Sequence, residues 1–178
     1  YNTHSTVCPI DFSSNDYLGL SQSEVIFQES HQYLVHKKML QNGATGSRLL
    51  SGNHPLYGEA ESGIAQFHKS ESALIFNSGY DANVGFFSSV PLKGDLILYD
   101  ELCHASIRDG IQLSNAKAYK FGHNDFEDLE RLIKRSQTEL GVVYIVTESI
   151  FSMDGDAPNL ENLVQLSNTY NCYLVVDE

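Results

Sequence analysis

The stretch LILYDELCHASIRDGIQL, residues 96–113, contains the structural unit that decides the fold. Its first four residues, 96–99, are all apolar without alternation, which is typical of a strand buried on both faces. A short polar loop follows, and Ala105–Leu113 then has the composition of a helix. A strand that leads through a short loop into a helix predicts one unit of a parallel sheet covered by helices.

The same alternation of apolar run and helical stretch continues along most of the chain. Four further apolar runs are candidate strands, at residues 73–76, 118–121, 142–146 and 173–176. Further helical stretches are expected near residues 81–89, 125–136 and 160–170. Asn124 followed by Glu127 predicts a capping box at the start of the stretch near residue 125. We therefore expect one α/β domain, with a mainly parallel sheet flanked by helices.

The residues before this alternating region predict helices joined by a polar loop. Ser23 is suited to cap a helix that runs to about Gln41, with Gly43 as its stop. Residues 43–53 are rich in Gly and Ser, and they could bring backbone amides and an arginine to an anion or serve only as a flexible connection. A second helix is expected from about Pro55, because proline suits the first helical position.

The composition argues against several classes of partner and site. Eleven basic and 23 acidic residues give the 178-residue chain a net charge of −12, which argues against binding to nucleic acid or to an anionic membrane surface. Cys8, Cys103 and Cys172 form no C-x-x-C pair, so the sequence favours neither a disulfide framework nor a zinc site. No apolar run is long enough to span a bilayer, and no signal peptide starts the chain. These features predict a cytoplasmic protein.

A candidate phosphate site follows the predicted strand at residues 73–76. In the motif NSGYDAN, residues 77–83, Gly79 would let backbone N–H groups approach an anion, and the start of the following helix adds a favourable dipole. Tyr80 would place a ring or a hydroxyl nearby. The same residues are equally consistent with a tight connection that binds no ligand. The motif is not a Walker loop, because no Gly-Lys-Ser/Thr follows it.

Three further candidates come after predicted strands, where residues of an open parallel sheet face the ligand crevice. His104 could stack on a planar ligand or transfer a proton, or it could simply begin the next helix at the surface. The polar loop at residues 148–156 could face a ligand or form a solvated turn, and it clusters too few carboxylates for a metal cage. Asp177 follows the last apolar run directly. If its carboxylate is half-buried, it requires a cation or a protonated nitrogen as a partner. If the strand end is exposed, the carboxylate requires no such partner.

Six motifs resemble those of one known family, both in their amino-acid sequence and in their order along the chain. The motifs are NDYLG at residues 15–19, GSRLLSG at 46–52, SGYDAN at 78–83, HAS at 104–106, FSMDG at 151–155 and VVDE at 175–178. Together they resemble the α-oxoamine synthases, fold-type I pyridoxal-phosphate enzymes that are usually homodimers. These enzymes join an amino acid to an acyl thioester with loss of carbon dioxide. Residues 46–53 most resemble the branch that condenses alanine with a pimeloyl thioester in biotin biosynthesis, and the branches that use glycine or serine are the alternatives.

The resemblance implies a pyridoxal 5'-phosphate site and gives roles to named residues. It places Gly79 and Tyr80 at the phosphate of the cofactor. It implies that His104 lies flat against the pyridine ring and faces the substrate. It also implies that Asp177 pairs with the protonated pyridine nitrogen, which keeps the ring an electron sink. His104 and Asp177 are accordingly the expected catalytic residues.

Three further residues receive supporting roles from the same resemblance. Glu148 and Ser152 would help to orient the oxygen side of the cofactor ring. Asn15 would bind the carboxylate of the substrate, and His104 is the second residue expected to contact the substrate. The implied partners are an amino acid, an acyl thioester and a second copy of the chain in a homodimer.

Several parts of the family pattern have no counterpart in these residues. They are the lysine that forms the Schiff base, a histidine soon after Asp177, a small C-terminal domain and an N-terminal substrate-binding arginine. We therefore expect a fragment of a longer protein. Residues 1–53 would lead into the large domain, and residues 54–178 would form the N-terminal part of that cofactor-binding domain. The complete protein would be the enzyme, and the alternative is a truncated homologue that has lost the chemistry.

Overall fold

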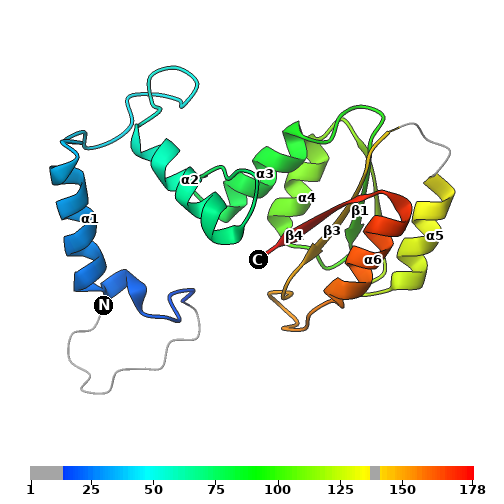
Figure 1. The fold of residues 1–178 in the computed structure, drawn as a ribbon. Coiled ribbons are helices and arrows are strands. Elements are labelled where there is room, and N and C mark those ends of the chain that lie inside the picture. Colours follow the sequence, from blue (N-terminus) through cyan, green and yellow to red (C-terminus); the bar gives the residue numbers. More distant parts are fainter. Residues whose placement is uncertain (1–13, 137–140) are drawn as a thin grey trace, which may run out of the picture. The chain divides into compact units, whose positions relative to one another are not determined.

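The computed structural model describes residues 14–136 and 141–178. The chain divides into two compact units, Tyr1–Ala60 and Glu61–Glu178, which are described separately (Figure 1). Cys8 lies outside the described residues. The start of the large domain at residue 54, expected from the sequence, stays a prediction.

The second unit is built on a four-stranded sheet in the order β2-β1-β3-β4, and every pair of neighbouring strands is parallel. The strands are β1 (Leu96–Asp100), β2 (Lys117–Phe121), β3 (Val143–Glu148) and β4 (Tyr173–Asp177). The helices are α3 (Gly79–Ser89), α4 (Ala105–Leu113), α5 (Phe126–Ser136) and α6 (Leu160–Tyr170). This arrangement confirms the α/β fold with a parallel sheet. Within residues 14–136 and 141–178, no helix is long and apolar enough to cross a membrane.

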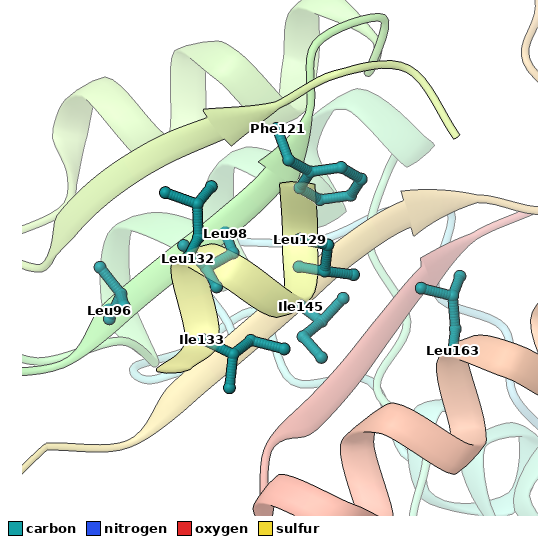
Figure 2. Packing of buried hydrophobic residues seen from close by; sticks show 8 residues of the cluster. All are labelled: Leu96, Leu98, Phe121, Leu129, Leu132, Ile133, Ile145 and Leu163. Carbon is teal, nitrogen blue, oxygen red and sulfur yellow. The ribbon is translucent and has the colours of Figure 1, made fainter. Parts of the chain in front are cut away.

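Consecutive apolar residues in the strands supply two cores, one on each face of the sheet. Leu96 and Leu98 of β1 belong to a cluster with residues of α5 and α6, which Figure 2 shows packed over the sheet. Ile97 belongs to a second cluster with residues of α3 and α4. Because successive side chains of a strand point to opposite faces, an unbroken apolar run indicates a strand covered on both sides.

Helices α3 and α4 approach each other closely at Gly110. A Cβ atom built on Gly110 would lie 2.8 Å from the carbonyl oxygen of Asn83 and 3.0 Å from the Cα atom of Val84. Both of these are backbone atoms of α3, so they cannot move aside without shifting the helix. Gly110 therefore sets the distance between the two helices that cover this face of the sheet.

The first unit contains the 3-10 helix η1 (Leu20–Gln22) and the helix α1 (Glu24–His36). The predicted cap is confirmed, since the Ser23 side chain accepts a hydrogen bond from the backbone N–H of Ile26. The predicted end at Gln41 with Gly43 as the stop is wrong. The helix ends at His36 because Lys38 adopts a left-handed conformation, with φ at 57°.

The helix α2 (Leu56–His68) spans the boundary between the two units. The sequence expected it to start near Pro55, and its first residue is Leu56. A proline at this point needs no intrahelical partner for its nitrogen, which has no hydrogen to donate.

The predicted strand at residues 73–76 does not form. In the structure this segment has no regular secondary structure, and the side chain of Leu74 is 63% exposed. The backbone N–H of Ile75 donates to the Glu61 carboxylate at 2.9 Å. A side chain of α2 therefore takes the N–H that a neighbouring strand would have used. The apolar composition of residues 73–76 does not reveal that the Glu61 side chain competes for the N–H of Ile75.

The predicted capping box at Asn124 and Glu127 is also wrong. The side chain that accepts from the first turn of α5 belongs to Asp125, whose Oδ1 atom lies 2.9 Å from the backbone nitrogen of Asp128. Asn124 is left-handed, with φ at 54°, and its side-chain amide donates to Asp156 at 2.9 Å. A contact distant in sequence therefore moves the cap by one residue.

We predict that Gly110→Ala destabilises the protein that carries this chain. The new methyl group meets the backbone of α3, and overpacking of this kind lowers the free energy of unfolding by about 1–3 kcal/mol. Gly63→Ala is the matched control, because a Cβ atom at Gly63 in α2 meets nothing within 4 Å. Helix propensity alone should make that control neutral or more stable by up to about 1 kcal/mol. Urea unfolding measures both changes, and equal stability of the two variants would contradict the close approach.

Candidate functional site

The candidate site lies at the carboxyl edge of the sheet, where the strand order changes direction. The chain passes from β1 to β2 on one side and then returns to place β3 on the other side of β1. Ligands of open parallel sheets bind outside the carboxyl ends of strands at such a switch point. Glu148 ends β3 beside Asp177, which ends β4, because these two residues are partners in the ladder.

A cavity of about 250 Å³ opens at this edge. The structure brings together in its lining every residue that the sequence assigned to the cofactor. These residues are Gly79, Tyr80, His104, Glu148, Ser152 and Asp177. They come from four separate parts of the chain, so their meeting is a property of the fold. Their individual roles stay predictions.

The start of α3 forms one wall of this cavity. Ser78 caps the helix, and its Oγ atom accepts from the backbone N–H of Asp81 at 3.0 Å. The first N–H groups of a helix have no partner within it, so Gly79 and Tyr80 place backbone donors at the wall of the cavity, and their binding of an anion stays a prediction. The Tyr80 hydroxyl donates to the carboxylate of Asp109, and this hydrogen bond raises the pKa of Tyr80 above its ordinary value.

His104 begins α4 and also lines the cavity. Its ring serves as the helix cap, with Nδ1 accepting from the backbone N–H of Ser106 at 3.2 Å. His104 therefore starts a helix at the surface, as one of the two expectations held, and it also lines the cavity; its stacking on a ligand or transfer of a proton stays a prediction. The backbone N–H of His104 donates to the Glu148 carboxylate at 2.5 Å, which ties the start of α4 to the end of β3.

Glu148 is a buried carboxylate, with 5% of the residue exposed. Burial raises the pKa of Glu148 above its ordinary value, and the nearby charge of Asp177 acts in the same direction. The hydrogen bond from the His104 backbone opposes these two effects. The site thus holds one carboxylate that resists ionisation next to a second that is less buried.

Asp177 is half-buried and accepts a hydrogen bond from the side-chain amide of Asn83 at 2.9 Å. The same amide nitrogen lies 3.0 Å from Ser106 Oγ. Asn83 and Ser106 lie within the motifs at residues 78–83 and 104–106, but the sequence predicted no role for either residue. One signal was available, because Gly79 and Asn83 are four residues apart and so lie on one face of α3.

Two expectations concern the N-terminal unit, and both stay predictions. Asn15 is exposed in that unit, and its contact with the substrate carboxylate remains untested. In the loop at residues 43–53, the guanidinium of Arg48 lies 4.0 Å from the centre of the Tyr57 ring. Arg48 Nε also donates to the Asn53 side chain at 3.2 Å. These contacts order the loop without requiring an anion.

The loop that carries Ser152 is held by His123, which follows β2. The two ring nitrogens of His123 each lie 2.9 Å from a carboxylate oxygen, Nδ1 from Asp100 and Nε2 from Asp156. The ring also packs edge-on against Phe151, with 4.5 Å between ring centres. Asp156 and Phe151 flank Ser152, so His123 anchors this side of the cavity. Over the part of the chain that the structure describes, no group of three His, Cys, Asp or Glu residues is placed to hold a metal ion.

The two carboxylates determine the charge state of His123. Burial acts to lower the pKa of His123, but the hydrogen bonds to Asp100 and Asp156 outweigh it and raise the pKa above its ordinary value. An imidazolium has two N–H donors, and both find an acceptor here. The protonated ring therefore clamps the loop more strongly than the neutral ring does.

Comparison with known proteins shows one family along nearly the whole chain. The model of the family described as aminotransferase class I and II matches residues 8–178. A protein of Halalkalibacterium halodurans named "Putative 8-amino-7-oxononanoate synthase" is 45% identical over 169 residues, which are 95% of this chain and 42% of that protein. A protein of the same name from Haemophilus influenzae strain Rd is 43% identical over an alignment of 179 positions, which covers all of this chain and 47% of that protein. The chain thus spans less than half the length of these relatives.

Solved structures agree with the sequence comparison. A serine palmitoyltransferase from S. paucimobilis, with a bound PLP–myriocin aldimine, matches with a TM-score of 0.82 and 31% identity. The match covers 91% of this chain and 41% of that one. The 8-amino-7-oxononanoate synthase of Francisella tularensis matches with a TM-score of 0.70 and 29% identity, over 95% of this chain and 44% of that one.

We predict that the contribution of His123 to stability is lost at high pH. Its pKa is raised in the folded state, so this contribution is complete below the unfolded pKa of about 6.5 and disappears as pH rises through the folded value. The melting temperature of His123→Gln should therefore lie furthest below that of the wild type near pH 6, and the gap should narrow toward about pH 9. His31→Gln, on the exposed surface of α1, is the control. A gap that stays constant with pH would rule out the clamp.

Proposed function

Because the chain belongs to the aminotransferase class I and II family, we propose that its cavity is the pyridoxal-phosphate site of an α-oxoamine synthase. The observation that carries this proposal is the convergence of three groups on one cavity: the start of α3, the ring of His104 and the carboxylate of Asp177. Each is suited to a different part of the cofactor, and the family likeness agrees with them.

The residues of the cavity fit the chemistry of pyridoxal phosphate. The unpaired N–H groups at the start of α3 suit the phosphate, since helix N-termini favour anions. Asp177 supplies a carboxylate to hold the proton of the pyridine nitrogen, and Asn83 supports that carboxylate at 2.9 Å. His104 supplies a planar ring at the surface of the cavity. The buried acid of Glu148 faces the same space and holds the backbone of His104.

We assign the following work to these residues. When bound, the cofactor supplies an electron sink for the carbanion at the α-carbon of an amino acid. Asp177 would hold a proton on the pyridine nitrogen, which would preserve that capacity. His104 would supply a ring surface to the cofactor and orient the substrate, while Gly79 and Tyr80 would hold the phosphate through backbone N–H groups. Ser152, on the loop clamped by His123, helps to position the oxygen side of the ring.

For the protein that carries this chain, we propose the decarboxylative condensation of L-alanine with a pimeloyl thioester. The products are 8-amino-7-oxononanoate, carbon dioxide and the free thiol, in biotin biosynthesis. The names of the relatives at 45% and 43% identity support this choice of substrates. We further propose a homodimer in the cytoplasm, on the basis of the family resemblance.

The likeness to serine palmitoyltransferase structures favours a second candidate within the same chemistry. In that case serine, in place of alanine, would condense with a longer acyl thioester. A glycine C-acetyltransferase is the remaining member of the class, and a non-catalytic homologue is the alternative outside it. All four possibilities keep the same fold, so only substrates and turnover separate them.

Substrate choice is tested with the protein that carries this chain, loaded with pyridoxal phosphate. Alanine, glycine and serine are each offered with pimeloyl, acetyl and palmitoyl thioesters, and thiol release is measured. We expect kcat/KM to be highest for alanine with the pimeloyl thioester. A preference for serine with palmitoyl or for glycine with acetyl thioester would reassign the activity within the family. Absence of turnover with every pair would favour the non-catalytic homologue.

We predict that Asp177→Asn lowers turnover by roughly 100-fold or more, because the neutral amide no longer holds a proton on the pyridine nitrogen. The fold should be retained, since the amide keeps the size of the side chain and can still meet Asn83. Glu161→Gln, on the exposed start of α6, removes a carboxylate away from the cavity and should leave turnover unchanged. Full activity of the Asp177→Asn variant would refute the assignment of this cavity.

A further inference from the structure

We infer that Asn83 is a positioning residue that orients both the carboxylate of Asp177 and the ring of His104. The inference rests on the proposed cofactor site, and it adds a residue that sets two of that site's functional groups at once. Asn83 lies on α3, Asp177 ends β4, and His104 begins α4. One side chain therefore connects three elements around the cavity.

The first connection runs from Asn83 to Asp177. The amide nitrogen of Asn83 lies 2.9 Å from Asp177 Oδ2. An ionised carboxylate only accepts hydrogen bonds, so the amide must present its N–H₂ group to it. This bond restricts rotation of the half-buried carboxylate, and it joins residues that are 94 positions apart in the sequence.

The second connection runs from Asn83 through Ser106 to His104. The amide nitrogen has two hydrogens, and Ser106 Oγ lies 3.0 Å from it. Ser106 Oγ lies in turn 2.7 Å from Nδ1 of His104. Ser106 is 1% exposed, so its hydroxyl satisfies its hydrogen bonds within the protein. It accepts from Asn83 and donates its own hydrogen to the imidazole.

The direction of this chain determines the tautomer of His104. Nδ1 accepts the Ser106 hydroxyl and also the Ser106 backbone N–H at 3.2 Å. A nitrogen that accepts carries no hydrogen, so the neutral ring has its hydrogen on Nε2. The same bonds fix the rotation of the ring. Asn83 thereby acts on His104 without touching it.

The test uses Asn83→Ala in the protein that carries this chain, with two readouts besides activity. The first is the dissociation constant of pyridoxal phosphate by calorimetry. We expect affinity to fall about 10- to 100-fold, the range for a lost hydrogen bond to a charged group. In the Asp177→Asn background the same substitution should have a smaller further effect, because the carboxylate it orients is gone and only the branch to His104 remains. An equal loss in both backgrounds would mean that Asn83 does not act through the charge of Asp177.

The second readout is the ¹⁵N chemical shifts of the His104 ring in protein without the cofactor, assigned with His104→Gln. We expect mainly the tautomer with hydrogen on Nε2 in the wild type and a larger share of the Nδ1–H tautomer in Asn83→Ala, because the Ser106 hydroxyl has lost the donor that directs its hydrogen toward Nδ1. Ser106→Ala is the second variant, because it breaks only the branch to His104. It should mix the tautomers and leave the link between Asn83 and Asp177 intact. Asn168→Ala, on the exposed face of α6, is the matched control and should change neither readout.

The outcomes separate this inference from the proposed function. A wild-type protein that fails to bind pyridoxal phosphate would refute the proposed function and the cofactor part of the inference. The tautomer measurement would still decide the part that concerns His104. Normal cofactor affinity and an unchanged tautomer in a folded Asn83→Ala variant would overturn the inference while leaving the proposed function in place.

Discussion

Three of the four strands end in a carboxylate, and the carboxyl edge of the sheet is organised around the need to give these groups hydrogen-bond donors. Asp100 ends β1, Glu148 ends β3 and Asp177 ends β4. Asp100 and Glu148 are almost fully buried, at 1% and 5% exposure. A buried carboxylate without donors costs several kcal/mol, so each of these groups recruits N–H donors from a loop or a helix. The positions of the loops around the candidate site therefore follow from the hydrogen bonds that the carboxylates at the strand ends require.

Packing and site chemistry meet in α3. The backbone carbonyl of Asn83 lies where a Cβ atom on Gly110 would meet it at 2.8 Å, while the side chain of the same residue reaches Asp177. A shift of α3 against α4 would therefore move the hydrogen bond between Asn83 and Asp177 along with the packing contact at Gly110. This coupling explains how a core built from apolar residues can hold polar groups at a fixed separation.

The sequence predicted the parts of the fold that depend on local pattern. Four of the five apolar runs form strands, and Ala105–Leu113 and Leu160–Tyr170 have the expected bounds. The run at residues 73–76 forms no strand, and the N–H of Ile75 donates to Glu61 in the structure. The cap at Asn124 failed because Asp100 and Asp156 hold that residue. The strand-end positions of His104, Glu148 and Asp177 were visible, since carboxyl ends of parallel strands share one edge. The hydrogen bond from Asn83 to Asp177 could not be predicted from the sequence, because it depends on how α3 packs against its neighbours.

The contact between Asn83 and Asp177 also constrains the order of events in synthesis. A ribosome adds about 5–20 residues per second, so the 94 residues that separate the two partners take at least several seconds to follow. During that interval α3 and β1 have been made, yet the carboxylate of Asp177 does not exist. This part of the lining of the candidate cavity thus forms only when the long-range contact closes. A nascent chain halted before β4 would carry the start of α3 without the carboxylate of Asp177, which lines the same cavity.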